Sequence, residues 1–159
     1  MAWTTPKTWS ADELVGAANL NTHIRDNMNE LKDPPFYHSA ITANWSASAT
    51  DYTGVSSLSA VLGTNGGDVL VGFQAATNTY RSCVNLLIDG SAYTSANSGL
   101  DWRPEFGTTA SKMHYTVWVT GLASGTHTFQ PILRTINAAN YAPLLGGQSP
   151  TIFWAREVS

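Results

Sequence analysis

The chain has 159 residues and a mass of 17.1 kDa, enough for one domain with a hydrophobic core and too few for two domains of ordinary size. Charged residues make up 12% and hydrophobic residues 43%, which excludes a disordered chain. The net charge of -3 and the pI near 5.7 argue against a nucleic-acid-binding protein, which normally carries a basic stripe. We therefore expect one folded unit whose surface is rich in Ser, Thr, Asn and Gly or is covered by neighbouring subunits.

The N-terminal segment is predicted to be an extended arm, residues 1–16, with a helical tip. Pro6 lies in a Thr-rich stretch, and Ser10 and Glu13 have the spacing of a capping box at a helix start. The segment lacks the basic start and apolar run of a signal peptide, and no apolar stretch approaches the ~20 residues that span a bilayer. We expect synthesis in the cytoplasm and no membrane partner. Two tryptophans of the arm are candidate docking residues, Trp3 and Trp9.

A helix is predicted over residues 17–32, where apolar residues recur at the helical period, and Asp33-Pro34-Pro35 should end it. A helix of about 16 residues is only marginally stable alone, so its stripe must pack either on the sandwich or on sister subunits. Asn27 lies at the edge of the stripe, where a polar residue can fix the register of a coiled coil or can simply be solvated. The candidate docking residues of the helix are Leu20, Ile24, Asn27 and Leu31, and Met28 continues the stripe.

From Phe36 onward the pattern changes to short β runs separated by turn residues. About eight antiparallel strands with no second helix predict a mainly β protein, an antiparallel and jelly-roll-like β-sandwich. The expected division is residues 1–35 for the arm and docking helix and 36–159 for the sandwich. Trp118 and Phe129 are predicted to be core, and Tyr115, Val117 and Val119 to share one strand face. The predicted strands are 37–45, 55–62, 69–76, 80–89, 112–120, 125–136, 141–145 and 151–158.

No catalytic constellation is found in the sequence. It has no Gly-x-Ser-x-Gly elbow and no P-loop, and its acidic residues in the predicted sandwich are mostly in turn-like settings. His114 and His127 lie on strands predicted to be adjacent and could meet as metal ligands, although strand pairing alone also brings side chains together. Cys83 is expected to be a buried small hydrophobe. We therefore expect no enzyme, no cofactor and no metal.

Aromatic residues in polar segments are the remaining chemical signal. A loop tryptophan beside an arginine can stack on a sugar or anchor a protein interface, but loop tryptophans more often plug the end of a sandwich. The predicted loop over residues 91–111 contains such a pair. The candidate ligand or receptor contacts are Trp102, Arg103 and Tyr141.

Two stretches of the chain resemble parts of tailed-phage structural proteins. Residues 8–15 followed by 18–28, which include Leu-Asn-Thr-His-Ile-Arg-Asp-Asn, are similar to the opening of many such proteins. Residues 122–129, with Gly-Thr-His-Thr-Phe, and 153–158 look like the last strands of phage fibre-tip and appendage domains. The chain departs from those fibres in one respect, because they usually carry a long shaft and here two prolines alone separate helix from sandwich.

The resemblance implies a non-enzymatic virion protein, assembled as a homotrimer and attached to other virion proteins through its N-terminus. A short tail appendage or fibre and a capsid-decorating protein are both open. The alternative is a receptor- or glycan-binding sandwich at a fibre tip, with a host-surface glycan as its partner. No nucleic-acid partner is expected.

Overall fold

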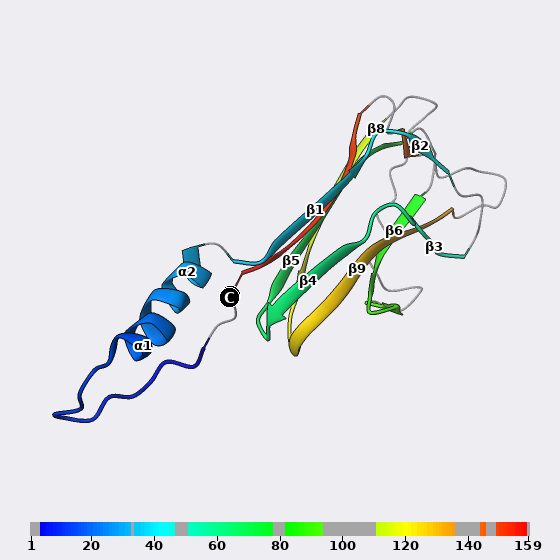
Figure 1. Cartoon of the computed structure of the whole chain (residues 1–159). Helices are drawn as coiled ribbons and strands as arrows, with labels where there is room; N and C mark the ends of the chain where they lie inside the picture. The colour runs from blue at the N-terminus through cyan, green and yellow to red at the C-terminus, as the bar shows by residue number, and fades with distance from the viewer. Residues whose placement is uncertain are drawn as a thin grey trace.

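A computed structural model of the chain describes residues 4–32, 34–46, 51–77, 82–93, 111–135, 144–145 and 149–158. It consists of an N-terminal arm with a helix and an antiparallel β-sandwich. Figure 1 shows the arm and helix extending from one end of an elongated sandwich. The predicted mainly β architecture with one helix is confirmed.

The N-terminal helix occupies the predicted residues but is not a uniform α-helix. It consists of α1 (Ala17–Leu20), the π-helical segment η1 (Asn21–Asp26) and α2 (Asn27–Lys32). Gly16 precedes it in an extended conformation, with φ −79° and ψ 150°. In the described ranges, no helix is both long and apolar enough to cross a bilayer.

The predicted helical tip of the arm is wrong. The carboxylate of Glu13 accepts the backbone N–H of Ser10 at 3.2 Å, as in a capping box, but the backbone N–H of Glu13 donates to the Ser10 carbonyl at 3.2 Å and forms a tight turn. Asp12 has φ 63°, a left-handed conformation that a helix does not continue. The capping-box spacing therefore stabilises a turn here, and the helix starts after Gly16.

The sandwich has two sheets, which we call sheet A and sheet B. Sheet A contains β1 (Phe36–Ile41), β11 (Thr151–Glu157), β5 (Val69–Thr77) and β8 (Ser111–Val119), in that order, with the short β10 (Leu144–Leu145) and β2 (Asn44–Trp45) at the end of β5. In sheet B, β4 (Ala60–Asn65) and β3 (Thr53–Gly54) pair with β9 (Ser124–Thr135), which is followed by β6 (Ser82–Ile88) and β7 (Ser91–Ala92).

The strand order explains why the sandwich is jelly-roll-like. Strands β4, β5, β6, β8, β9 and β11 alternate between the two sheets along the chain, so most connections cross from one sheet to the other. Such crossing connections between two antiparallel sheets are typical of the jelly roll. They also place β1 and β11, from the two ends of the sandwich sequence, side by side with Phe36 opposite Arg156.

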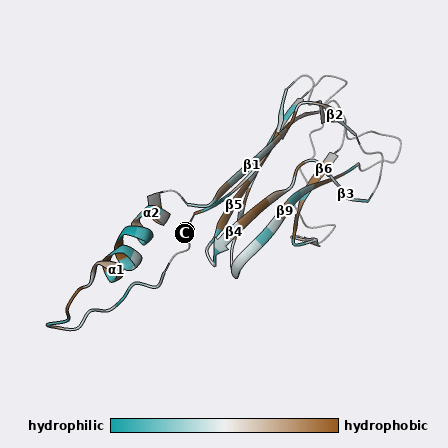
Figure 2. Cartoon of the chain, in the orientation of Figure 1, coloured by the Kyte–Doolittle hydropathy of each residue, from teal (hydrophilic) through white to brown (hydrophobic). Residues whose placement is uncertain are grey.

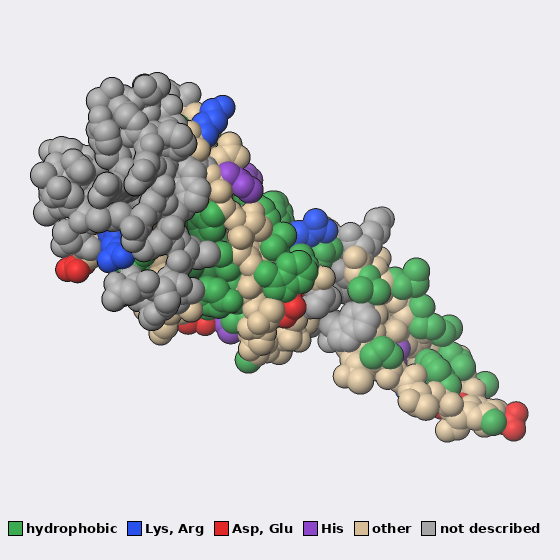
Figure 3. All heavy atoms as spheres, turned by 180° about the vertical axis from the view of Figure 1, so that it is seen from behind, with side chains coloured by type: hydrophobic (Ala, Val, Ile, Leu, Met, Phe, Trp, Pro, Cys, Tyr) green, Lys and Arg blue, Asp and Glu red, His purple; other side chains and the backbone are tan. Residues whose placement is uncertain are grey.

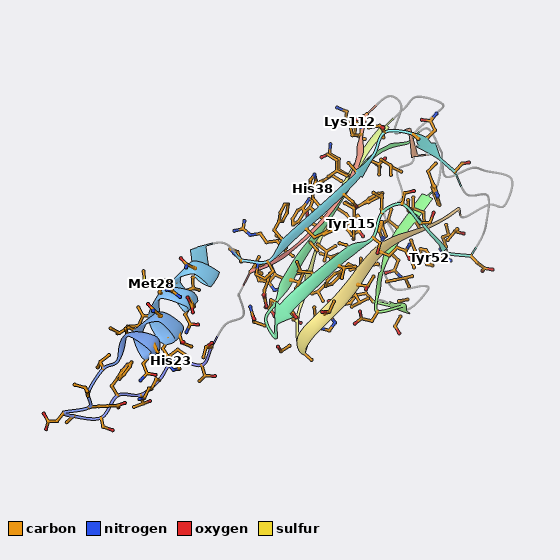
Figure 4. All side chains as sticks on the ribbon, viewed as in Figure 1. His23, Met28, His38, Tyr52, Lys112 and Tyr115 are labelled. Atoms are coloured by element: carbon orange, nitrogen blue, oxygen red, sulfur yellow. The ribbon has the colours of Figure 1, made fainter. Side chains whose placement is uncertain are left out.

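The core lies between the sheets, where alternate residues of facing strands are buried. Phe73 and Phe153 from sheet A and Phe129 from sheet B are fully buried. Tyr115, Val117 and Val119 share one face as predicted, and this face points into the core, where burial raises the pKa of the Tyr115 phenol above its ordinary value (Figure 4). Figure 2 shows hydrophobic stretches along β4 and β5, whereas the helix also carries hydrophilic stretches. Cys83 is buried, as expected of a small hydrophobe.

The prediction that Trp118 and Phe129 both lie in the core is wrong for Trp118. Its side chain is 56% exposed, because successive residues of a strand point to opposite faces and its neighbours Val117 and Val119 occupy the inner one. The apolar character of Trp118 suggested burial, but its parity on β8 decides its position.

The strand predicted over 55–62 is also partly wrong. Val55 and Leu58 are buried, but the backbone N–H of Leu58 donates to the Val55 carbonyl at 2.9 Å, which forms a turn. Strand β4 begins at Ala60 and continues to Asn65, into the segment predicted as a glycine-rich break. The turn comes at Gly66, whose φ of 94° is open to glycine without strain. An apolar run cannot distinguish a buried turn from a buried strand, because both bury the same side chains.

A buried carboxylate fastens the end of the sandwich nearest the helix. Glu157 is 1% exposed, and its carboxylate accepts the backbone N–H groups of Asn65 at 2.7 Å and Gly67 at 3.2 Å and the side-chain amide of Asn65 at 3.2 Å. Its own backbone N–H donates to the carbonyl of Pro35 at 3.0 Å. One residue therefore ties the β4–β5 turn to the last strand and to the point where the helix leaves the sandwich.

Candidate docking surface on the N-terminal helix

The arm is folded back on itself around its turn. The Lys7 ammonium pairs with the Glu13 carboxylate and lies 4.7 Å from the centre of the Trp9 ring. Lys7, and after it the Ser10 N–H, hold the pKa of the Glu13 carboxyl below its ordinary value. Trp9 is therefore half-buried within the arm.

Asn27 joins the helix to the arm. Its side-chain amide donates to the Thr4 carbonyl at 2.6 Å, and its side-chain oxygen accepts the Thr4 N–H at 2.9 Å. One turn earlier on the helix, His23 Nδ1 lies 3.2 Å from the Thr5 carbonyl, to which it can donate. Asn27 is 4% exposed, so these bonds are shielded from water.

This arrangement assigns Asn27 an intrachain bond that the sequence did not predict. The residue does lie at the edge of the apolar stripe, but its amide is occupied by the arm of its own chain. The spacing of four residues between His23 and Asn27 could have indicated a polar face. The spacing could not have indicated what that face contacts, because no local sequence pattern shows that the arm packs against the helix.

The apolar stripe remains uncovered in the chain. The exposed fraction rises from 42% at Leu20 and 45% at Ile24 to 66% at Leu31, and Leu14 at the end of the arm is 93% exposed. Figure 3 shows these hydrophobic side chains as a band along the helical part of the molecule. The described residues of the chain's own sandwich, one of the two packing partners considered above, therefore do not cover this stripe.

The exposed stripe has an energetic consequence. Fully burying a Leu, Ile or Met side chain contributes roughly 1.5–3 kcal/mol relative to leaving it exposed. The described helix obtains little of this contribution, and its length makes it marginal on its own. Its polar face is satisfied by the arm, so a partner that covers the apolar face would stabilise the whole arm–helix unit.

The two histidines that the predicted strand order could have brought together, His114 and His127, do not meet. His114 is on β8 in sheet A and His127 is on β9 in sheet B, so the two are not strand neighbours. His127 instead has two acceptors, the Asp89 carboxylate at 2.7 Å from Nδ1 and the Ala123 carbonyl at 2.9 Å from Nε2. Among the described residues, no three His, Cys, Asp or Glu side chains gather as metal ligands would.

His127 and Asp89 form a hydrogen-bonded pair between β9 and the turn after β6, which we call the clasp. The Asp89 hydrogen bond, then the Ala123 carbonyl, raise the pKa of His127, because two acceptors favour the imidazolium that donates from both nitrogens. The Thr128 N–H and then His127 lower the pKa of Asp89. The clasp holds the β6–β7 turn against β9, and we assign it no chemistry beyond that.

The other predicted contacts, Trp3, Trp102, Arg103 and Tyr141, lie outside the described residues. Comparison of the sequence with protein-family models gave no match, and comparison with curated proteins gave none either. The stripe formed by Leu20, Ile24, Met28 and Leu31 is thus the candidate site that sequence pattern and geometry identify together.

Proposed function

We propose that this chain is a non-enzymatic structural subunit of a tailed-phage particle, which assembles as a homotrimer through its arm–helix unit. The sandwich then projects away from the attachment point. The observation that carries the proposal is the exposed apolar stripe on a helix whose opposite, polar side is closed by the arm.

Two further features support this function. A low charged fraction leaves few charged side chains to cover the surface of a monomer, which favours a chain that hides surface against copies of itself. The helix sequence resembles the attachment end of tailed-phage structural proteins, and this resemblance supplies both the virion setting and the number of three copies. The shape, with the helix at one end of the sandwich, suits attachment at that end (Figure 1).

The test places a carboxylate in the stripe. Ile24→Asp should abolish trimer formation, because an unpaired charge in an apolar interface costs several kcal/mol. Thr22→Asp is the matched control, since Thr22 is exposed on the same helix and outside the stripe. Light scattering should give a trimer mass for the intact protein and for Thr22→Asp, and a monomer mass for Ile24→Asp. A monomer mass for the intact protein at micromolar concentration would contradict the proposal.

The virion setting has its own measurement. Labelled protein added to particles that lack it should appear at regular positions in electron micrographs, on the tail for an appendage and on the shell for a decorating protein. Ile24→Asp should reduce this occupancy, and Thr22→Asp should not. If the protein forms a trimer but binds to no particle, the homotrimer part of the proposal stands and the virion part is wrong.

A further inference from the structure

The outer face of sheet A presents aromatic and cationic side chains in one row. Phe36, Arg156, Leu70 and Trp118 are direct cross-strand neighbours on β1, β11, β5 and β8, so all four point to the same side. Neighbouring strands lie about 4.8 Å apart, so the row extends across about 14 Å. Figure 3 shows hydrophobic side chains gathered over this part of the sandwich, with Lys and Arg among them.

The aromatic side chains of this face are held in place. The Trp118 Nε1–H donates to the Asp68 carboxylate at 2.8 Å, although the ring is 56% exposed. In the next row the Trp154 ring lies across Gly72, where an added Cβ would come within 2.2 Å of it. A rigid ring loses little entropy on binding, so these two tryptophans form a preorganised stacking surface.

The face is cationic although the chain as a whole has a net charge of -3. Arg156 and Lys112 are exposed here and form no hydrogen bond or ion pair with the described residues, and His38 and His114 are exposed on the same face. Figure 4 labels His38 on β1 and Lys112 on β8. Among the described residues of the face, Asp68 is the one acid, and its carboxylate already accepts the Trp118 N–H.

These features indicate which kind of partner can bind the outer face of sheet A. A second copy of this face would offer Arg156 and Lys112 no free carboxylate among the described residues, because Asp68 already accepts the Trp118 N–H, so pairing of two like-charged faces is disfavoured. A flat aromatic surface suits the apolar face of a sugar ring, and a nearby guanidinium suits a carboxylate, which it can bind through two parallel hydrogen bonds.

We propose that the outer face of sheet A binds an anionic polysaccharide, whose sugar rings stack on Trp118 and Trp154 and whose carboxylates pair with Arg156. This binding goes beyond the assembly role of the helix. It also places the ligand on described strands rather than on the loop residues identified from sequence.

The test titrates the full-length protein with an oligogalacturonate while its tryptophan fluorescence and binding heat are followed. Trp118→Ala should weaken binding about tenfold, and Arg156→Gln by a similar factor, because each removes one main contact. Val61→Ala is the control variant, since Val61 is 53% exposed on β4 of the other sheet, and it should bind as the unchanged protein does. The expected affinity falls as salt rises.

Two control ligands separate stacking from charge. A maltooligosaccharide has the rings without the carboxylates, and polyglutamate has the carboxylates without the rings, so each should bind at least tenfold more weakly than the oligogalacturonate. Equal binding of polyglutamate, or no effect of Trp118→Ala, would overturn the proposal. If the unchanged protein is a trimer, a monomer mass for Trp118→Ala would also overturn the proposal, because the face would then be an interface between copies. The binding measurements do not depend on whether the helix forms the trimer.

Discussion

The sandwich buries its apolar surface within the chain, whereas the arm–helix unit leaves an apolar stripe exposed. In the sandwich, two sheets cover each other, and large residues such as Phe73 and Phe129 lose all contact with water. The helix has the extended arm on its polar side, but no other described segment covers its apolar side, and Ile24 stays 45% exposed. A two-layer unit can close its own core, whereas a single amphipathic helix needs a second apolar surface from outside. The comparison therefore supports the proposal that the sandwich carries the fold and that the helix carries association.

The largest expected effect lies in the sandwich, at Glu157. Glu157→Ala leaves the buried N–H groups of Asn65 and Gly67 without their acceptor, which should lower the free energy of unfolding by about 2–4 kcal/mol. Denaturant unfolding followed by tryptophan fluorescence measures this change. The trimer mass should persist wherever the protein is folded, because the helix stripe is untouched.

Glu157→Gln is the matched control for that change. It keeps a side-chain oxygen for the backbone donors and loses the bond from the Asn65 amide, so its loss should be clearly smaller. If alanine and glutamine destabilise equally, the hydrogen-bonded carboxylate is not what fastens this end of the sandwich. Another interaction would then have to stabilise the end of the sandwich from which the helix leaves.

A smaller effect is expected where the arm meets the helix. Asn27→Ala removes the two bonds to Thr4, each of which contributes about 1 kcal/mol. Hydrogen exchange should show at least a tenfold loss of protection at the Thr4 amide and none at the core strands. Asn29→Ala is the control, since Asn29 is exposed on the same helix. Loss of protection in the sandwich would contradict the independence of the two units.

The smallest effect concerns pH and the clasp of His127 with Asp89. Because the pKa of His127 is raised on folding, its contribution to stability is fully present below the ordinary value of about 6.5 and is lost as pH rises through the folded-state pKa. Asp89 is half-exposed, so screening should limit the contribution to about 0.5 kcal/mol. The unfolding free energies of the unchanged protein and of His127→Gln should therefore converge between pH 6 and pH 9.

His114→Gln provides the comparison for that titration. His114 is exposed on β8, so its replacement should change the free energy of unfolding little. An identical pH profile for the unchanged protein and His127→Gln would show that the clasp carries no proton-linked stability. Asp89 stays ionised throughout the range, because its pKa is lowered.

Local patterns predicted elements well and contacts poorly. The period of Leu20, Ile24, Met28 and Leu31 predicted the helix over its full length, because helical spacing is visible in any amphipathic sequence. The spacing of Ser10 and Glu13 predicted a helix and produced a turn, because the same two hydrogen bonds fit both. The bond between Asn27 and Thr4 links residues 23 positions apart, which no local pattern contains.

The strands show the same limit at the level of faces. Alternation on β8 correctly grouped Tyr115, Val117 and Val119, yet Trp118 was expected inside with them. Hydrophobic character favoured burial of Trp118 as well as of the other three residues. Successive residues of a strand point to opposite faces, so only one of these two faces of β8 can line the core. The candidate aromatic face could not be predicted, because Phe36 and Trp118 become members of one row through the order of strands in sheet A.

The amino-acid sequence by itself determined the helix, its end before Pro34, most strands and the apolar stripe, because each depends on spacing between near neighbours or on residues that forbid a conformation. The tertiary structure alone decided that the stripe stays uncovered, that Glu157 is buried among backbone donors and that Trp118 faces outward. These properties depend on which distant segments meet. That choice is made by packing two whole sheets together, and it is therefore not contained in any single segment.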